Sequence, residues 1–131
     1  MRSCRMLAIP VVILGASLVF AAEDKPLTPV EARKAVGKKI TVEMTVQAAK
    51  DRLENRGEIY LDSETNFSDE KNFAVVITRA GAASLKSAGI DSPADYFKDK
   101  KIQASGTVKE VDKVLRIEID DAKQIRLVES K

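Results

Sequence analysis

Histidine is absent from the 131-residue chain, and cysteine occurs once, as Cys4. Without histidine the chain has no His-ligated zinc site and no Ser-His-Asp catalytic triad. Cys4 lies in an N-terminal segment that we expect to be removed, and its loss excludes thiol nucleophiles, cysteine zinc sites and disulfides. The missing disulfides favour a bacterial exported protein over a small eukaryotic secreted one.

The first 21 residues have the order of a cleavable secretory signal. Arg2 and Arg5 precede an uncharged, mostly apolar run over residues 6–20, and charged residues begin at Glu23. The apolar run is shorter than the roughly 20 residues that span a bilayer, which argues against an uncleaved anchor. The sequence therefore predicts export to the periplasm or the extracellular space, with no stable membrane span after cleavage.

Cleavage is predicted after Ala21, because Val19 and Ala21 then occupy the two small-residue positions, whereas cleavage one residue later would place Phe20 there. Removal of residues 1–21 takes two arginines and no acid, and so removes the whole formal net charge of +2. The remaining chain has the length of one compact domain. We divide it into an N-terminal segment, 22–35, and a domain over residues 36–128.

A short helix is predicted over residues 29–36. Thr28 is a typical N-cap, Pro29 suits the first helical position, and Glu31 completes a capping box. Gly37 is typical of the residue that ends a helix.

Beyond Gly37 the apolar period is two, which indicates strands separated by polar turns. Strands are expected over residues 40–48, 58–62, 72–78, 101–111 and 114–119, with a short extended segment at 125–127. Residues 50–56 are predicted to form a polar turn, 63–71 a polar loop, and 112–113 a tight connection. Residues 80–98 have a helical pattern with an apolar face of Ala83, Leu85 and Ala88.

The order of three strands, a helix and two strands is that of a five-stranded OB-fold Greek-key barrel. The expected fold class is therefore mainly β, with a helix between strands three and four and a short N-terminal helix. Gly106 within the fourth strand is consistent with a sharp bend there.

Several segments also resemble small exported bacterial OB-fold domains of the nucleic-acid-binding OB superfamily. They are residues 36–42 (VGKKITV), 57–62 (GEIYLD), 73–77 (FAVVI), 96–108 (YFKDKKIQASGTV) and 121–125 (DAKQI). The chain departs from that pattern at Glu43, Asp99 and Ala122. The resemblance covers nearly the whole domain, and it implies the fold and a capacity to bind nucleic acid.

The face of strands two and three, with its flanking loops, is where an OB-fold binds oligonucleotides. Tyr60 lies on this predicted face and is suited to stack on a base. We expect Lys50, Arg52, Arg56 and Asn72 to supply polar contacts. The neighbouring acids weaken a phosphate-binding interpretation, and the alternative is that these basic residues only balance acids on an ordinary surface.

No cofactor and no metal site are predicted. Residues 62–69 (DSETNFSD) alternate oxygen-bearing side chains, but Phe67 stands where a calcium loop requires glycine and Phe73 where it requires glutamate. A solvated acidic loop is the simpler interpretation. Asp120 and Asp121 are adjacent and point to opposite sides of a strand, which is poor geometry for acid–base catalysis.

Two hypotheses follow for the function. The first is an exported, non-catalytic OB-fold binding module for nucleic acid or another oligomeric ligand, using the face around Tyr60. The alternative is an envelope protein-interaction or accessory domain that has no small ligand and docks through exposed strand edges.

Overall fold

The structure is a computed structural model that describes residues 25–128, so the predicted export signal lies outside the described residues. Within that range no helix has the length and apolar character needed to cross a membrane. The elements run in the order α2 (Pro29–Ala32), β1 (Lys39–Thr45), β2 (Ala48–Arg52), α3 (Leu53–Arg56), β3 (Glu58–Asp62), β4 (Ala74–Thr78), α4 (Arg79–Ser87), α5 (Pro93–Phe97), β5 (Lys101–Thr107), β6 (Lys109–Val111), β7 (Val114–Ile119), η2 (Ala122–Gln124) and β8 (Ile125–Leu127).

The capping box predicted for α2 is present. Thr28 Oγ1 accepts a hydrogen bond from the Glu31 amide at 3.2 Å, and the Thr28 amide donates to Glu31 Oε1 at 2.9 Å. The helix is shorter than predicted and ends at Ala32, which is buried. Gly37 has a positive φ of 87° and marks the turn into β1.

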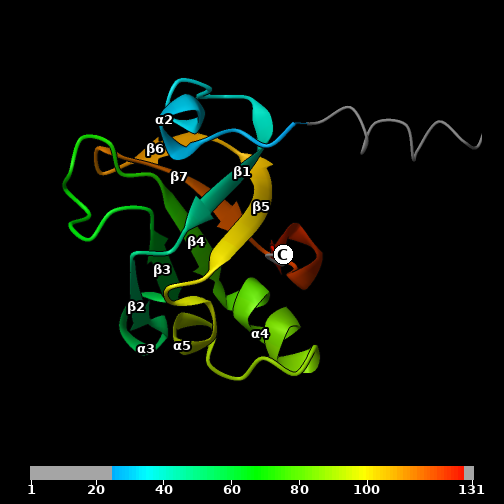
Figure 1. Cartoon of the computed structure of the whole chain (residues 1–131). Helices are drawn as coiled ribbons and strands as arrows, with labels where there is room; N and C mark the ends of the chain where they lie inside the picture. The colour runs from blue at the N-terminus through cyan, green and yellow to red at the C-terminus, as the bar shows by residue number, and fades with distance from the viewer. Residues whose placement is uncertain (1–24, 129–131) are drawn as a thin grey trace, which may run out of the picture.

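The strands form two sheets, with the orders β1–β5–β8 and β2–β3–β4–β7–β6 (Figure 1). The mainly β class is confirmed, but the single closed five-stranded barrel is wrong for the described residues. The fourth predicted strand, 101–111, divides between the sheets into β5 and β6, and the first, 40–48, corresponds to β1. β4 and β7 pair in parallel, while the other pairs are antiparallel.

The predicted turn over residues 50–56 is also wrong in part. Lys50 and Arg52 lie on β2, which pairs with β3 in the register Lys50↔Tyr60 and Arg52↔Glu58. Only residues 53–56 form a turn of helix, α3, which ends at Gly57 with a φ of 74°. The segment is polar because β2 is an edge strand on which Lys50, Asp51 and Arg52 are exposed.

Helices α4 and α5 lie between β4 and β5 along the chain, as predicted. α4 packs against β4, and α5 packs against β2 and β3 (Figure 1). The predicted apolar face of the helix was only partly right, because α4 buries Gly81, Ala82 and Leu85 and exposes Ala83. The Thr78 side chain accepts from the Gly81 amide and starts the helix at Arg79, which determines its rotation.

The core lies between the sheets and under the helices. Alternate apolar residues of β1, β3, β4, β5 and β7 point into it, and Phe73 and Phe97 are its largest fully buried side chains. Gly81 allows the close approach of α4 to β7, since a Cβ there would lie 2.0 Å from the Ile119 carbonyl oxygen. This packing leaves the outer face of the five-stranded sheet free to form a site.

Candidate ligand-binding groove

A groove of about 650 Å³ crosses the outer face of the five-stranded sheet. Its rim carries exposed charged and polar residues, and its floor combines small or apolar residues with the buried Asp62 and Arg116. These residues are Lys50, Arg52, Asn55, Arg56, Glu58, Tyr60, Asp62, Phe67, Ala74, Val76, Val111, Asp112, Val114 and Arg116. They come from β2, α3, β3, β4, the loop before β4, and the β6–β7 hairpin.

Strand register brings these side chains together. Residues two apart on a strand share a face, so Glu58, Tyr60 and Asp62 of β3 point the same way. The pairing Lys50↔Tyr60↔Val76 forms one row across three strands. The next row is Asp62↔Ala74↔Arg116.

Four of the five predicted contact residues line this groove: Lys50, Arg52, Arg56 and Tyr60. The three cations are exposed, and Tyr60 is half-buried. Glu58 and Asp62 of β3 and Ala74 and Val76 of β4 line the same groove.

Asn72, the fifth predicted contact residue, does not line the groove. Its side chain is 2% exposed and holds the loop over residues 63–73. Nδ2 donates to Asp62 Oδ1 at 3.1 Å and to the Phe67 carbonyl at 3.3 Å, while Oδ1 accepts from the Glu64 amide at 2.9 Å. The prediction of Asn72 as an exposed contact was wrong because its amide satisfies the backbone of a folded loop.

Tyr60, Glu58 and Arg116 form a hydrogen-bonded chain along the groove. The Tyr60 hydroxyl donates to Glu58 Oε1 at 2.6 Å, and Arg116 Nη2 donates to Glu58 Oε2 at 3.0 Å. Arg116 Nη2 also donates to Glu118 Oε2 at 2.8 Å. Burial first, and then the bond to Glu58, raise the pKa of Tyr60, with Arg56 opposing that shift. The ring therefore stays neutral and held in place.

Arg116 and Phe67 are groove residues that the sequence reasoning missed. Leu115, Ile117 and Ile119 pack in or against the core, so alternation along β7 places Arg116 on the opposite face. What was missing was the parallel pairing of β7 with β4, which brings that face to the groove. Nε of Arg116 is buried and has no hydrogen-bond partner within residues 25–128.

Phe67 forms an apolar wall from the loop before β4. Its side chain is 52% exposed, and Lys50 Nζ lies 5.1 Å from the ring centroid. That distance is within the range of a cation–π interaction. The loop was predicted to be a polar, solvated segment, yet it presents this aromatic ring beside a cation of the neighbouring strand.

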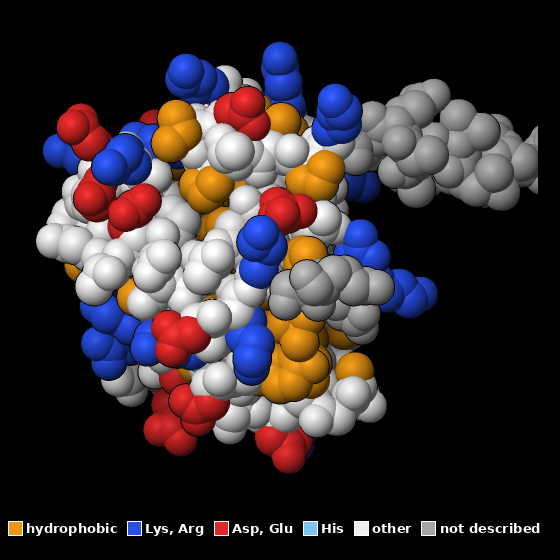
Figure 2. Space-filling model, viewed as in Figure 1, with side chains coloured by type: hydrophobic (Ala, Val, Ile, Leu, Met, Phe, Trp, Pro, Cys, Tyr) orange, Lys and Arg blue, Asp and Glu red, His pale blue; other side chains and the backbone are white. Residues whose placement is uncertain are grey.

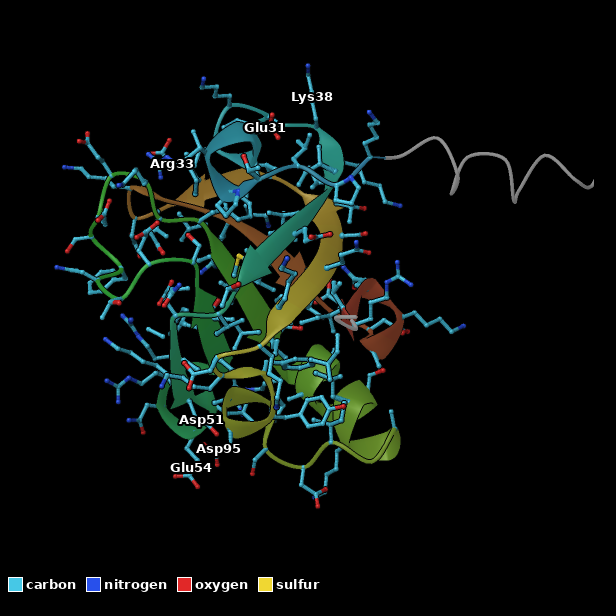
Figure 3. The ribbon with its side chains drawn as sticks, in the orientation of Figure 1. Glu31, Arg33, Lys38, Asp51, Glu54 and Asp95 are labelled. Atoms are coloured by element: carbon cyan, nitrogen blue, oxygen red, sulfur yellow. The ribbon has the colours of Figure 1, made fainter. Side chains whose placement is uncertain are left out.

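The acidic residues near the groove should repel a phosphate backbone less than the sequence suggested. Asp51 pairs with Ile59 and therefore faces away from Lys50 and Arg52. Figure 3 shows Asp51 and Glu54 with Asp95 at the end of the molecule beside α3 and α5. Over the face drawn in Figure 2, basic and acidic side chains are interspersed.

The structure gives the remaining acids local roles. Within residues 25–128, no three Cys, Asp or Glu side chains gather in a way that could hold a metal ion. Asp120 Oδ1 accepts from Thr78 Oγ1 at 2.6 Å. Asp121 caps η2 by accepting from the Lys123 amide at 2.8 Å. Asp120 thus links the end of β7 to β4, and the bond made by Asp121 is local to η2.

No protein-family model matches the sequence, and no curated protein matches it. Solved structures share its fold. They include a protein assigned as an aspartyl-tRNA synthetase from Leishmania major Friedlin (TM-score 0.54, 11% identity), an asparaginyl-tRNA synthetase from Pyrococcus horikoshii (0.53, 12%) and an aspartyl-tRNA synthetase from Entamoeba histolytica (0.53, 14%).

These similarities cover 83%, 82% and 84% of this chain but only 21%, 24% and 22% of the synthetase chains. The chain thus spans between a fifth and a quarter of the length of the structures it matches. At such low identities the similarity establishes a shared fold, and the matched parts are OB-folds.

Proposed function

We propose that this chain is an exported, non-catalytic OB-fold module that binds single-stranded nucleic acid in the groove around Tyr60. One observation carries the proposal. Three exposed cations, two aromatic rings and the small or apolar side chains of Ala74 and Val76 converge on the sheet face that OB-folds use for oligonucleotides.

The cations are suited to a phosphate backbone. Within the described part of the chain, Lys50, Arg52 and Arg56 form no ion pair with a carboxylate. Their charges are therefore available to replace counterions on a strand. Their side chains lie along one side of the groove, on β2 and α3.

The aromatic rings are suited to bases. Tyr60 lies on β3, and Phe67 lies on the loop that leads into β4. Stacking of a base on such a ring contributes about 1–3 kcal/mol in single-strand-binding proteins and tolerates any base. Ala74 and Val76 between β3 and β7 are small, so a flat ring has room to approach the sheet.

The nearly neutral overall charge predicts little long-range attraction of a nucleic acid, but it does not prevent binding in the groove. Charges separated by more than about 8–10 Å are largely screened at moderate salt, so the local cations matter more than the distant acids. Glu58 is already bonded to Tyr60 and Arg116. We therefore expect moderate affinity that depends strongly on salt.

The export and non-catalytic parts of the proposal rest on the sequence. The first 21 residues have the pattern of a secretory signal. The chain has no histidine, and Cys4, its single cysteine, lies within that signal. Detection of the protein in the periplasm or the medium, with a mature N-terminus at Ala22, would support export.

Binding is tested by fluorescence anisotropy with labelled single-stranded DNA and RNA between about 20 and 200 mM salt. If three phosphates are neutralised, a plot of log K against log salt has a slope of about −2 for a single strand. Absence of binding to either polymer at low salt would refute the nucleic-acid proposal.

Two triple variants distinguish the effect of the groove cations from the effect of the overall charge of the protein. Changing Lys50, Arg52 and Arg56 to Gln removes the groove cations and should abolish most of the salt-dependent binding. A control triple variant at Lys38, Lys39 and Lys98, also to Gln, removes the same charge away from the groove. Equal losses in the two variants would show that the groove is not the binding surface.

A protein-interaction domain is the second candidate, and the sheet order favours it. In the order β2–β3–β4–β7–β6, the strands β2 and β6 each pair on one side only within the described chain. Such edges can add a strand from a partner. A periplasmic partner that slows hydrogen exchange at amides of β2 or β6 would support this function, provided that no oligonucleotide binds.

A further inference from the structure

Asp62 lies on the floor of the groove with unused hydrogen-bonding capacity. Its side chain is 3% exposed, and Oδ1 accepts from Asn72 Nδ2 at 3.1 Å. An ionised carboxylate offers about four lone-pair positions, so most of its acceptor capacity is not used by that bond. Its cross-strand neighbours are Ala48 and Ala74, whose short side chains leave space above it.

The other groove carboxylates are placed differently. Both oxygens of Glu58 are bonded, to Tyr60 and to Arg116. Asp112 is exposed at the tip of the β6–β7 hairpin, where its φ is 52°. Asp62 is therefore the groove carboxylate that is both buried and able to accept a ligand hydrogen.

The nearby cations Arg116 and Lys50 do not use the free acceptor positions of the Asp62 carboxylate. Arg116 shares a cross-strand row with Asp62, but its Nη2 is bonded to Glu58 and Glu118. Lys50 Nζ lies over the Phe67 ring. Within residues 25–128, neither cation forms an ion pair with Asp62.

We infer that Asp62 determines base preference in this groove, by accepting hydrogen bonds from a guanine that is stacked against Tyr60 or Phe67. The inference rests on the proposed function. Tyr60 and Asp62 are two residues apart on one strand, about 7 Å along it. A base stacked beside the ring thus brings its polar edge to the carboxylate.

Guanine is favoured by the chemistry of its edge. Its N1–H and N2–H₂ groups are adjacent donors that match the two oxygens of a carboxylate. Adenine and cytosine each present an amino group next to a ring acceptor, which repels the second oxygen. Thymine and uracil present one donor between two carbonyl oxygens, so they should bind least well.

The test uses heptanucleotides of thymidine that carry guanine, inosine, adenine or thymine at the central position, with uridine-based RNA counterparts. Inosine lacks only the 2-amino group of guanine. At neutral pH and low salt we expect the guanine oligomer to bind roughly tenfold tighter than the all-thymine oligomer, with inosine between them. DNA and RNA should show the same order, because the contact is to the base.

Asp62→Asn should reduce the guanine preference to less than about twofold, since the amide replaces one acceptor by a donor. Asp95→Asn is the matched control, because it removes an equal charge from an exposed position outside the groove and should keep the preference. Circular dichroism verifies folding, and the guanine–inosine comparison on the unaltered protein does not depend on any variant.

Measurable but equal binding of guanine, inosine and thymine oligomers would overturn this inference and leave the proposed function intact. A guanine preference that survives Asp62→Asn would overturn it as well. If none of the oligomers binds at low salt, the proposed function fails and the inference fails with it.

Discussion

The Tyr60 hydroxyl is bonded to the carboxylate of Glu58, two residues before it on the same strand, at 2.6 Å. The second oxygen of that carboxylate is bonded to Arg116 on β7, which is 58 positions further along the chain. The contact fixes the ring of Tyr60 and occupies a carboxylate that would otherwise repel an anionic ligand. The effect of the Glu58–Tyr60 pair on a bound ligand therefore depends on Arg116 of the distant strand β7.

Replacement of Tyr60 should separate stacking from hydrogen bonding. Tyr60→Ala removes the ring and should weaken single-strand binding by about 1–3 kcal/mol, or roughly 5- to 150-fold. Tyr60→Phe keeps the ring and should change affinity less than about threefold. Both are measured by anisotropy at low salt. Tyr96→Ala is the control, because Tyr96 is 40% exposed and lies outside the groove.

Arg116→Met should destabilise the fold. The side chain is 10% exposed, and its loss leaves Glu58 and Glu118 facing each other without a shared cation. Because those two carboxylates are 25% and 24% exposed, we expect about 2 kcal/mol rather than the 3–5 kcal/mol of a fully buried pair. Urea denaturation measures the change.

The control for that experiment is Arg126→Met. Within residues 25–128, the exposed Arg126 side chain donates only to Gln103 on β5, through Nε at 3.1 Å and Nη2 at 2.6 Å. Its removal should alter the free energy of unfolding by less than about 0.5 kcal/mol. If both variants lose the same stability, the Arg116 network has no special energetic role.

Asp62 should make stability fall as pH rises. Burial raises its pKa above the ordinary 3.8, while the bond from Asn72 and the charge of Lys50 partly oppose the shift. The folded state then holds the proton more tightly than the unfolded state. The resulting stabilisation is present below the unfolded pKa and is lost as pH rises through the folded pKa.

The measurement compares the unaltered protein with Asp62→Asn in urea between about pH 3 and pH 7. The free energy of unfolding of the protein minus that of the variant should decrease with rising pH. A difference that increases with pH for Asp62 would mean that Asn72 and Lys50 outweigh burial.

Gly81→Ala should be among the most damaging single changes. The added Cβ would meet the Ile119 carbonyl oxygen at 2.0 Å, so α4 or β7 has to move. We expect a loss of about 3 kcal/mol, near the upper end for overpacking. Ala83→Gly on the exposed side of the same helix should cost about 1 kcal/mol. A Gly81→Ala protein as stable as the original would contradict the close contact.

The candidate site was only partly predictable. Alternation in β3 correctly placed Glu58, Tyr60 and Asp62 on one face, because a strand exposes every second residue. The edge strand β2 was missed, since its exposed side chains show no apolar alternation. Asn72 was placed on the surface because nothing local reveals that its amide holds an eleven-residue loop, 63–73.

What the sequence by itself determined was local: the capping box of α2, the periods of β1, β3 and β7, and the tight turn at Asp112 and Lys113. Each depends on residues within a few positions, where backbone preference and alternation act directly. The tertiary structure alone decided the register of β2, β3, β4 and β7, and hence the groove. Such pairings join residues far apart in the chain and depend on packing between both sheets and the helices, which no local pattern encodes.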